Sequence, residues 1–271
     1  MSGLHQLLKD LQTRATYKYY QLRIDTQKNP CRIQFRESPY RILFVLSHMR
    51  SGSSLLTHIL NSNPEIIGYG ETHLNYESEK DFKALMFRVY WRLRDLNMNH
   101  TYLLDKVLHD HKFLNEDFLS SDKLYNIFLL REPKRTLESI LDIKSHLTEE
   151  QAANYYINRL SHLEQYAKLI NSKERSLLIT YEQLLKKSDL VFAELQSFLK
   201  TQAGFSEKYQ VLKTTGIRGI GDSSENIKAG KIIRKERQLD RQISPELTEK
   251  SIQAFNKSQS ILSQYCRLIE F

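Results

Sequence analysis

The segment of residues 41–62 constrains the fold more than any other part of the chain. A run of apolar residues of strand length, 41–47, is followed by a short loop that contains Arg50, Gly52 and three serines. Apolar residues then recur at helical spacing over 53–62. In such a unit the loop amides and the first helical turn face an anion, and the helix dipole favours negative charge. The segment therefore predicts a strand, a loop and a helix that together bind a phosphate-like group.

Composition narrows the class of protein. The 271 residues are 40% hydrophobic with few Gly and Pro, which indicates one folded domain over 1–271. The net charge of +8 favours anionic partners such as nucleotides, nucleic acid or acidic lipid. Only Cys31 and Cys266 occur, so we expect no disulfide framework and a reducing compartment. No apolar stretch approaches ~18 residues and no basic start precedes an apolar segment, which predicts a soluble, cytoplasmic protein.

Short apolar runs alternate with helical patterns along most of the chain. Strands are predicted at 41–47, 66–69, 102–104, 124–130 and 177–181, and helices at 53–62, 78–96, from Pro133, at 149–171 and within 242–271. This alternation predicts an α/β fold with a doubly wound parallel sheet. Residues 1–35 form a basic amphipathic extension that we expect to pack on its own domain, although such a helix can also lie on a membrane or clasp a partner. Residues 212–241 are predicted to form a loop over the site.

The candidate functional residues follow the predicted strands. Ligands of an open parallel sheet sit beyond the carboxyl ends of its strands. The polar residues at those positions are Arg50 to Ser54, Glu71, Lys106 with His109, and Arg131 with Ser139. We expect these separate segments to converge on one anionic ligand.

The first loop does not fit a nucleoside-triphosphate site. Such a loop needs a second glycine followed by lysine, with a hydroxyl that binds Mg²⁺, whereas Arg50 precedes the single glycine, Gly52, and no lysine follows. The loop instead resembles the 5′-phosphosulfate loop of sulfotransferases that use 3′-phosphoadenosine 5′-phosphosulfate (PAPS). The resemblance implies a P-loop-like sulfotransferase fold and assigns to the donor Arg50, Ser51, Gly52, Ser53, Ser54 and Leu55.

Two further motifs carry the same resemblance. The strand ending at Arg131, with Pro133 and then Ser139, is similar to the 3′-phosphate motif of that family. Glu71, flanked by Gly70 and Thr72, resembles the catalytic-base segment of the tyrosylprotein sulfotransferase branch. That branch also implies further donor contacts at Tyr181, Ser223, Ser224, Asn226 and Lys228. The membrane anchor of the tyrosylprotein enzymes has no counterpart here, which speaks against a peptide tyrosine acceptor.

The resemblance implies an in-line sulfuryl transfer that depends on positioning and charge stabilisation. Glu71 would take the acceptor proton, and Arg50 and Lys106 would stabilise the sulfuryl oxygens. His109 is the alternative base, because cytosolic sulfotransferases use a histidine close after a lysine. No metal is required in this scheme, and the pair His109 and His111 alone is a weak metal signature. Lys106 could also be an ordinary solvated lysine.

The leading hypothesis is a sulfotransferase that acts on a hydroxyl or nitrogen of a small molecule, with a secondary metabolite as the expected acceptor. A kinase with a degenerate phosphate loop is the alternative enzyme. A nucleic-acid-binding module is the non-enzymatic alternative, but the basic residues are scattered except over 228–241. We expect no nucleic-acid or membrane partner, and leave open a homodimer formed through the N-terminal helix.

Overall fold

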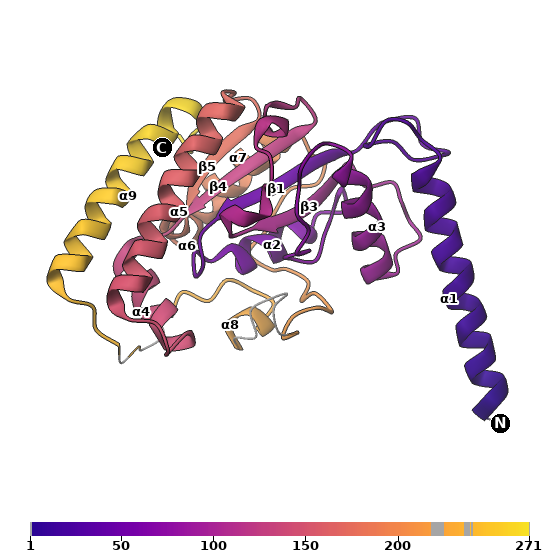
Figure 1. Ribbon diagram of the computed structural model, residues 1–271, viewed down its shortest axis with the longest axis horizontal. Coiled ribbons are helices and arrows are strands. Elements are labelled where there is room, and N and C mark those ends of the chain that lie inside the picture. The colour runs from indigo at the N-terminus through magenta and orange to yellow at the C-terminus, as the bar shows by residue number, and fades with distance from the viewer. Residues whose placement is uncertain (1, 218–224, 236–238, 240, 271) are drawn as a thin grey trace.

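In the computed structural model, which describes residues 2–217, 225–235, 239 and 241–270, five parallel strands form one sheet in the order β2-β3-β1-β4-β5 (Figure 1). The strands are β1 (Arg41–Ser47), β2 (Ile66–Ile67), β3 (Tyr102–Val107), β4 (Leu124–Leu130) and β5 (Ser176–Thr180). The main helices are α1 (Ser2–Asp25), α2 (Ser53–Asn61), α3 (Asp81–Leu93), α4 (Pro133–Ile143), α5 (Glu149–Ile170), α6 (Tyr181–Lys186), α7 (Ser188–Leu199), α8 (Glu225–Lys228) and α9 (Pro245–Tyr265). The predicted doubly wound α/β class is confirmed.

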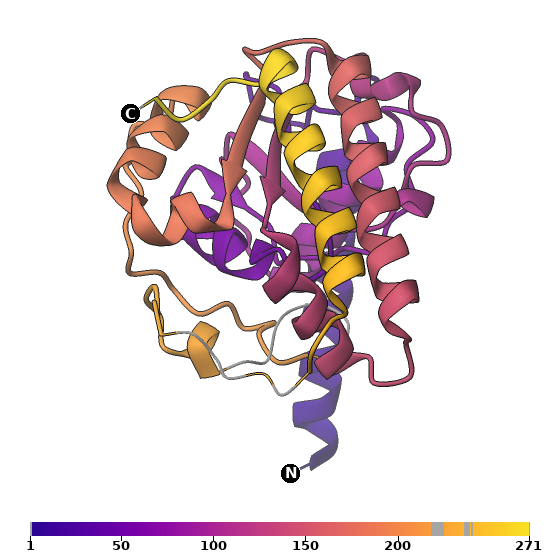
Figure 2. The same ribbon diagram turned by 90° about the vertical axis from the view of Figure 1, so that its left-hand side faces the viewer.

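Each face of the sheet has its own apolar core. Alternate residues of a strand point to opposite faces, and along β1 Ile42, Phe44 and Leu46 belong to one buried cluster while Leu43 and Val45 belong to the other. Helices α3, α4, α5 and α9 contribute to the first cluster, and α2, α6 and α7 to the second. Figure 2 shows α5 and α9 side by side over one face, with α6 and α7 at the opposite side of the sheet. A sheet buried on both faces explains why its strands read as continuous apolar runs.

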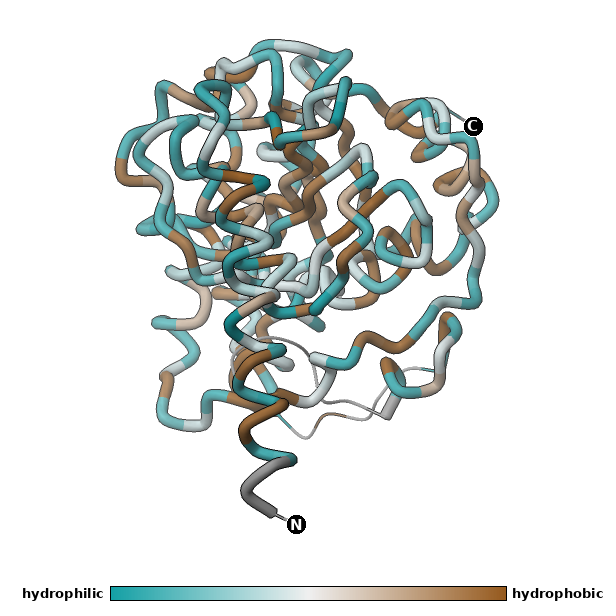
Figure 3. Tube along the Cα trace, turned by 90° about the vertical axis from the view of Figure 1, so that its right-hand side faces the viewer, coloured by the Kyte–Doolittle hydropathy of each residue, from teal (hydrophilic) through white to brown (hydrophobic). Residues whose placement is uncertain are grey.

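The N-terminal helix α1 packs only by its second half. Tyr20 and Ile24 are fully buried, and the ring of Tyr17 meets that of Phe87 on α3 at 5.1 Å. The first half projects away from the body of the molecule (Figures 1 and 3), and the side chains described there are exposed. The predicted packing of this segment on its own domain therefore holds for residues 17–25 and not for the residues before them.

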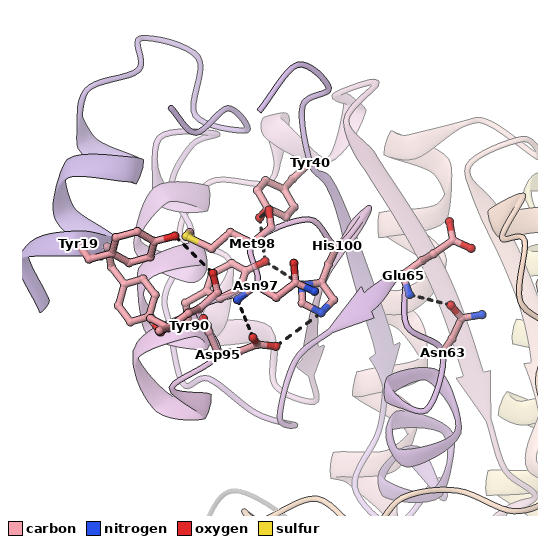
Figure 4. Close-up of polar contacts among 11 residues, drawn as sticks. Tyr19, Tyr40, Asn63, Glu65, Tyr90, Asp95, Asn97, Met98 and His100 are labelled. Carbon is pink, nitrogen blue, oxygen red and sulfur yellow. Dashed lines mark hydrogen bonds and ion pairs between the residues drawn. The ribbon is translucent and has the colours of Figure 1, made fainter. Parts of the chain in front are cut away.

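A buried polar cluster underlies the attachment of α1 (Figure 4). Tyr40 and Tyr90 share a hydrogen bond of 2.8 Å between their hydroxyls, and the Tyr40 hydroxyl donates to the carbonyl of Met98. The Tyr90 hydroxyl also lies 3.1 Å from Nδ1 of His100. From α1, the Tyr20 hydroxyl donates to the carbonyl of Asp95 at 2.8 Å. These bonds fix the loop between α3 and β3, and the base of α1 rests on that loop.

Candidate active site

The loop of residues 48–52 joins the carboxyl end of β1 to α2. Arg50 and Gly52 have left-handed backbone conformations, with φ angles of 63° and 88°, which turn the chain sharply into the helix. A Cβ atom at Gly52 would lie 2.2 Å from Cδ2 of Tyr181, so the position requires glycine. No side chain caps the start of α2, and the buried Ser51 hydroxyl has no hydrogen-bond partner in the part of the chain described. Uncapped amides and an unpaired hydroxyl are groups that an anion would satisfy.

Two arginines predicted to bind the donor lie close to each other here: Arg50 belongs to this loop, and Arg131 lies beside it. Arg131 follows β4, and its Nη1 donates to the carbonyl oxygen of Arg50 at 3.1 Å. Nε of Arg50 donates to Oγ of Ser139 on α4 at 2.8 Å. The guanidinium carbon of Arg131 lies 4.4 Å from the ring centre of Tyr181, the first residue after β5. The structure thus brings together Arg50, Arg131, Ser139 and Tyr181 from four separate segments.

Lys106 is not a solvated lysine. Its Nζ lies 3.4 Å from Oε1 of Glu71 and 3.3 Å from Oγ of Ser54, and its side chain is only 4% exposed. Since β3 continues to Val107, Lys106 is a strand residue whose side chain points to the face covered by α2. Glu71, the predicted base, Lys106, the predicted cation, and the first turn of α2 therefore meet at one point.

His109 occupies a different environment from Glu71. Its ring lies 5.4 Å from that of His111 and 6.3 Å from that of Tyr155. Burial, followed by the positive charges of His111, Arg159 and nearby lysines, lowers the pKa of His109 to about 4. A neutral imidazole with so low a pKa is a weak proton acceptor, and the salt bridge to Lys106 belongs to Glu71. Of the two predicted bases, Glu71 is the one that pairs with Lys106.

His48 links the phosphate loop to β4 and was not anticipated from the sequence. Its Nε2 accepts the backbone N–H of Arg131 at 3.1 Å, and its Nδ1 lies 2.9 Å from the carbonyl oxygen of Met49. These contacts require a neutral imidazole with the proton on Nδ1. Complete burial is the main cause that lowers the pKa of His48 to about 3. The available signal was a histidine directly after the predicted strand 41–47.

Two residues of α5 support the carboxyl edge of the sheet and were also missed. The Tyr155 hydroxyl accepts the backbone N–H of Met49 at 2.9 Å and donates to the carbonyl of Leu108 at 3.2 Å. Arg159, fully buried, donates to the carbonyl oxygens of Ser47 and Val107, both at 2.9 Å. Nothing in the helical pattern of α5 reveals which of its polar residues turn inward.

Residues 212–217 cover the Lys106 side of the site. Thr214 donates from its hydroxyl to the carbonyl oxygen of Tyr69 at 3.1 Å, and Oγ1 of Thr215 lies 2.7 Å from Nε2 of His58 on α2. A small cavity remains beneath this segment. It is lined by Ser54, Thr57, His58, Tyr69, Gly70, Lys106, Leu212, Thr214 and Thr215.

Of the remaining residues predicted to contact the donor, the structure describes only some. Ser223 and Ser224 lie outside the described residues. Asn226 and Lys228 belong to α8, with exposed side chains, and the carbonyl of Asn226 accepts the Tyr209 hydroxyl at 3.3 Å. Their contact with a donor stays a prediction. Within the described ranges, no group of three or more His, Cys, Asp or Glu side chains is arranged to hold a metal ion, and no described helix is long and apolar enough to span a membrane.

Comparison with solved structures defines the class of fold. The chain is similar to the sulfotransferase domain from the curacin biosynthetic pathway, with a TM-score of 0.55 and 19% identity over 82% of this chain and 99% of that one. It is also similar to mouse sulfotransferase SULT7A1 complexed with PAP (adenosine 3′,5′-bisphosphate), with a TM-score of 0.51 and 13% identity over 92% and 93% of the two chains. No family model and no curated protein matches the sequence.

The chain therefore has the sulfotransferase fold, as the motifs predicted. At these identities the likeness concerns the architecture of the sheet and helices, and the closer resemblance to the tyrosylprotein branch stays a prediction.

Proposed function

We propose that this protein is a sulfotransferase that uses PAPS as donor and a small molecule with a hydroxyl or amine as acceptor. The observation that carries the proposal is the convergence, at the carboxyl edge of a sulfotransferase-fold sheet, of the residues that the motifs assigned to that reaction. Those residues are Arg50, Glu71, Lys106, Arg131 and Ser139. The likeness to a domain from a biosynthetic pathway supports a small-molecule acceptor.

The residues present fit the donor. The uncapped start of α2, the left-handed Gly52 and the Ser51 hydroxyl, which has no partner among the described residues, would form a cradle for the 5′-phosphosulfate. Arg131, which borders the same loop from β4, is suited to the 3′-phosphate, and a planar guanidinium binds phosphate in a bidentate manner. When bound, PAPS supplies the sulfuryl group that is transferred.

Glu71 and Lys106 would divide the chemistry between them. The acceptor oxygen or nitrogen forms a bond to sulfur while the bond from sulfur to the bridging oxygen breaks, and that oxygen keeps the electron pair. Glu71 receives the acceptor proton. Lys106, with Arg50, stabilises the charge on the sulfuryl and bridging oxygens in a site where the lysine is buried. The opposite charge of Glu71 keeps Lys106 paired before the donor arrives.

A thermal-shift titration tests the donor. Saturating PAP should raise the melting temperature clearly, and Arg131→Ala should abolish most of that rise. Lys134→Ala is the matched control, because Lys134 is an exposed cation three residues away that faces solvent. Stabilisation by ATP with Mg²⁺ but not by PAP would refute the proposal and support the kinase alternative.

A turnover assay tests the base. With PAPS and a panel of phenols, alcohols and amines, Glu71→Gln should lower PAP formation by about two orders of magnitude while PAP still stabilises the variant. His109→Gln should retain most of the activity. The reverse pattern would assign the base to His109.

A further inference from the structure

Asp105 is a buried carboxylate next to the reacting pair that the mechanism above does not use. It precedes Lys106 on β3 and is 2% exposed. Successive residues of a strand point to opposite faces, so Lys106 reaches toward α2 while Asp105 points to the other face. There it meets Tyr76, whose ring packs on Phe44 at 5.1 Å.

Four hydrogen-bond donors converge on this carboxylate. Oδ1 accepts the backbone N–H groups of Thr72 and Lys106, both at 2.9 Å. Oδ2 accepts the hydroxyl of Thr72 at 2.7 Å and that of Tyr76 at 2.6 Å. An ionised carboxylate can accept from all four groups at once, and each of these hydrogen bonds favours its charged form. Burial raises the pKa of Asp105, and the hydrogen bonds from Tyr76, Thr72 and Lys106 act in the opposite direction, so they offset part of the desolvation penalty.

The residues bound by Asp105 are the neighbours of Glu71 and Lys106. Thr72 directly follows Glu71, and the Lys106 amide also lies 3.3 Å from the carbonyl oxygen of Gly70 on the other side of Glu71. Gly68 approaches β3 so closely that a Cβ atom there would lie 2.5 Å from the carbonyl oxygen of Leu104. The segment 68–72 therefore packs directly against β3. Asp105 holds the end of this segment through its hydrogen bonds with Thr72.

We propose that Asp105 is a positioning residue that holds the carboxylate of Glu71 against the ammonium group of Lys106. This inference rests on the proposed function, because it assigns Asp105 a role in turnover. Asp105 acts through Thr72 and through the backbone of Lys106, and its own side chain touches neither donor nor acceptor. The transfer rate therefore depends on Asp105 and donor binding does not.

The test removes one hydrogen bond to Asp105 at a time and keeps the packing. Tyr76→Phe and Thr72→Val each delete one contact to Asp105. Tyr102→Phe is the matched control: it is a buried tyrosine of β3 on the opposite face, whose hydroxyl donates to the carbonyl of Leu199 at 2.7 Å, far along the strand from Glu71. Conversion of PAPS to PAP is followed with the acceptor panel and with water alone, together with the melting temperature and the shift caused by PAP.

Tyr76→Phe and Thr72→Val should lower kcat by roughly tenfold or more, since a misplacement of about 1 Å can cost up to a hundredfold. The KM for PAPS and the thermal shift with PAP should stay unchanged, and Thr72→Ser should restore the rate. Tyr102→Phe should lose stability but not turnover. Equal turnover in Tyr76→Phe and Tyr102→Phe would overturn the proposal.

A different result would separate this inference from the proposed function. If the wild-type protein neither binds PAP nor releases it from PAPS, the function fails, and the crystal structure of Tyr76→Phe then decides the role of Asp105. A Glu71–Lys106 separation clearly longer than 3.4 Å would support the holding role, and an unchanged pair would overturn it.

Discussion

At the scale of single residues, Gly52 links backbone geometry to donor binding. It combines a φ of 88° with a contact that leaves no space for a side chain, because a Cβ would lie 2.2 Å from the ring of Tyr181. We expect Gly52→Ala to lower PAP affinity at least tenfold, as the displaced loop loses its amide contacts. Isothermal titration calorimetry with PAP measures this change.

Gly216 provides a control for the same substitution. Its φ is 83°, yet no atom of the described residues lies within 4 Å of the position of a Cβ, so Gly216→Ala carries the backbone strain, roughly 1 kcal/mol, without the clash. Gly216→Ala should keep its affinity for PAP. If both variants lose affinity for PAP equally, backbone strain rather than the clash with Tyr181 explains the loss in Gly52→Ala.

His48 makes stability depend on pH. The unfolded chain binds a proton on this residue near pH 6.5, whereas the folded protein binds one only near pH 3, so lowering the pH favours the unfolded state. Between pH 7 and pH 5 the free energy of unfolding should fall by about 2 kcal/mol from His48 alone. His109 adds a smaller loss of the same sign, because it is partly exposed.

Urea unfolding of His48→Gln at both pH values checks this assignment. The Gln side chain can still accept the Arg131 N–H, but it does not titrate. The variant should lose about 2 kcal/mol less than the wild type over this interval. An identical loss in the two proteins would show that His48 titrates normally in the folded state.

At the scale of secondary-structure elements, the two halves of α1 should contribute unequally to stability. Leu7, Leu8 and Leu11 are more than half exposed, whereas Ile24 is fully buried. Replacing the three leucines by glutamine should change the free energy of unfolding by less than about 1 kcal/mol, since both residues are good helix formers. Ile24→Ala should cost about 2–5 kcal/mol. A large loss in the triple variant, measured by thermal unfolding, would mean that the first half of α1 packs on another surface.

Some elements were predictable from the sequence, and others were not, for physical reasons. The strands β1 and β4 are long apolar runs that end in polar loops, so their limits were predicted to the residue. The strand β3 was predicted too short because Asp105 and Lys106 look like a solvated end. Contacts with Thr72, Tyr76, Glu71 and Ser54 make their burial tolerable. The helix α6 was missed because it has only six residues and follows β5 without a loop, and α7 because a single residue separates it from α6.

The arrangement of the site residues was likewise predictable in part. Convergence of Arg50, Lys106 and Arg131 follows from the rule that the carboxyl ends of parallel strands share an edge. The hydrogen bond from Arg50 to Ser139 does not follow from it, because the motif assigned Ser139 with Arg131 to one phosphate and said nothing of Arg50. Such pairings depend on side-chain directions across elements distant in sequence, which motif spacing does not encode.

At the scale of the whole molecule, Arg159 ties the helical layer to the edge of the sheet that carries the site. Its guanidinium donates to the last carbonyl of β1 and to the last carbonyl of β3, and it forms an ion pair with Asp110. These are the ends from which the phosphate loop and the segment of His109 begin. Because the side chain is fully buried, its removal leaves buried carbonyl groups without donors.

Arg159→Leu should therefore lower the free energy of unfolding by about 3–5 kcal/mol, measured by urea unfolding at pH 7. Arg267→Leu is the control: Arg267 is 40% exposed and pairs with Glu194, whose side chain is 16% exposed, so this change should cost less, about 1–2 kcal/mol. Saturating PAP should stabilise Arg267→Leu as it does the wild type, and Arg159→Leu less, because the loop that grips the donor starts from the edge that Arg159 holds. Equal losses in the two variants would show that the fully buried Arg159 contributes no more to stability than the partly exposed Arg267 does.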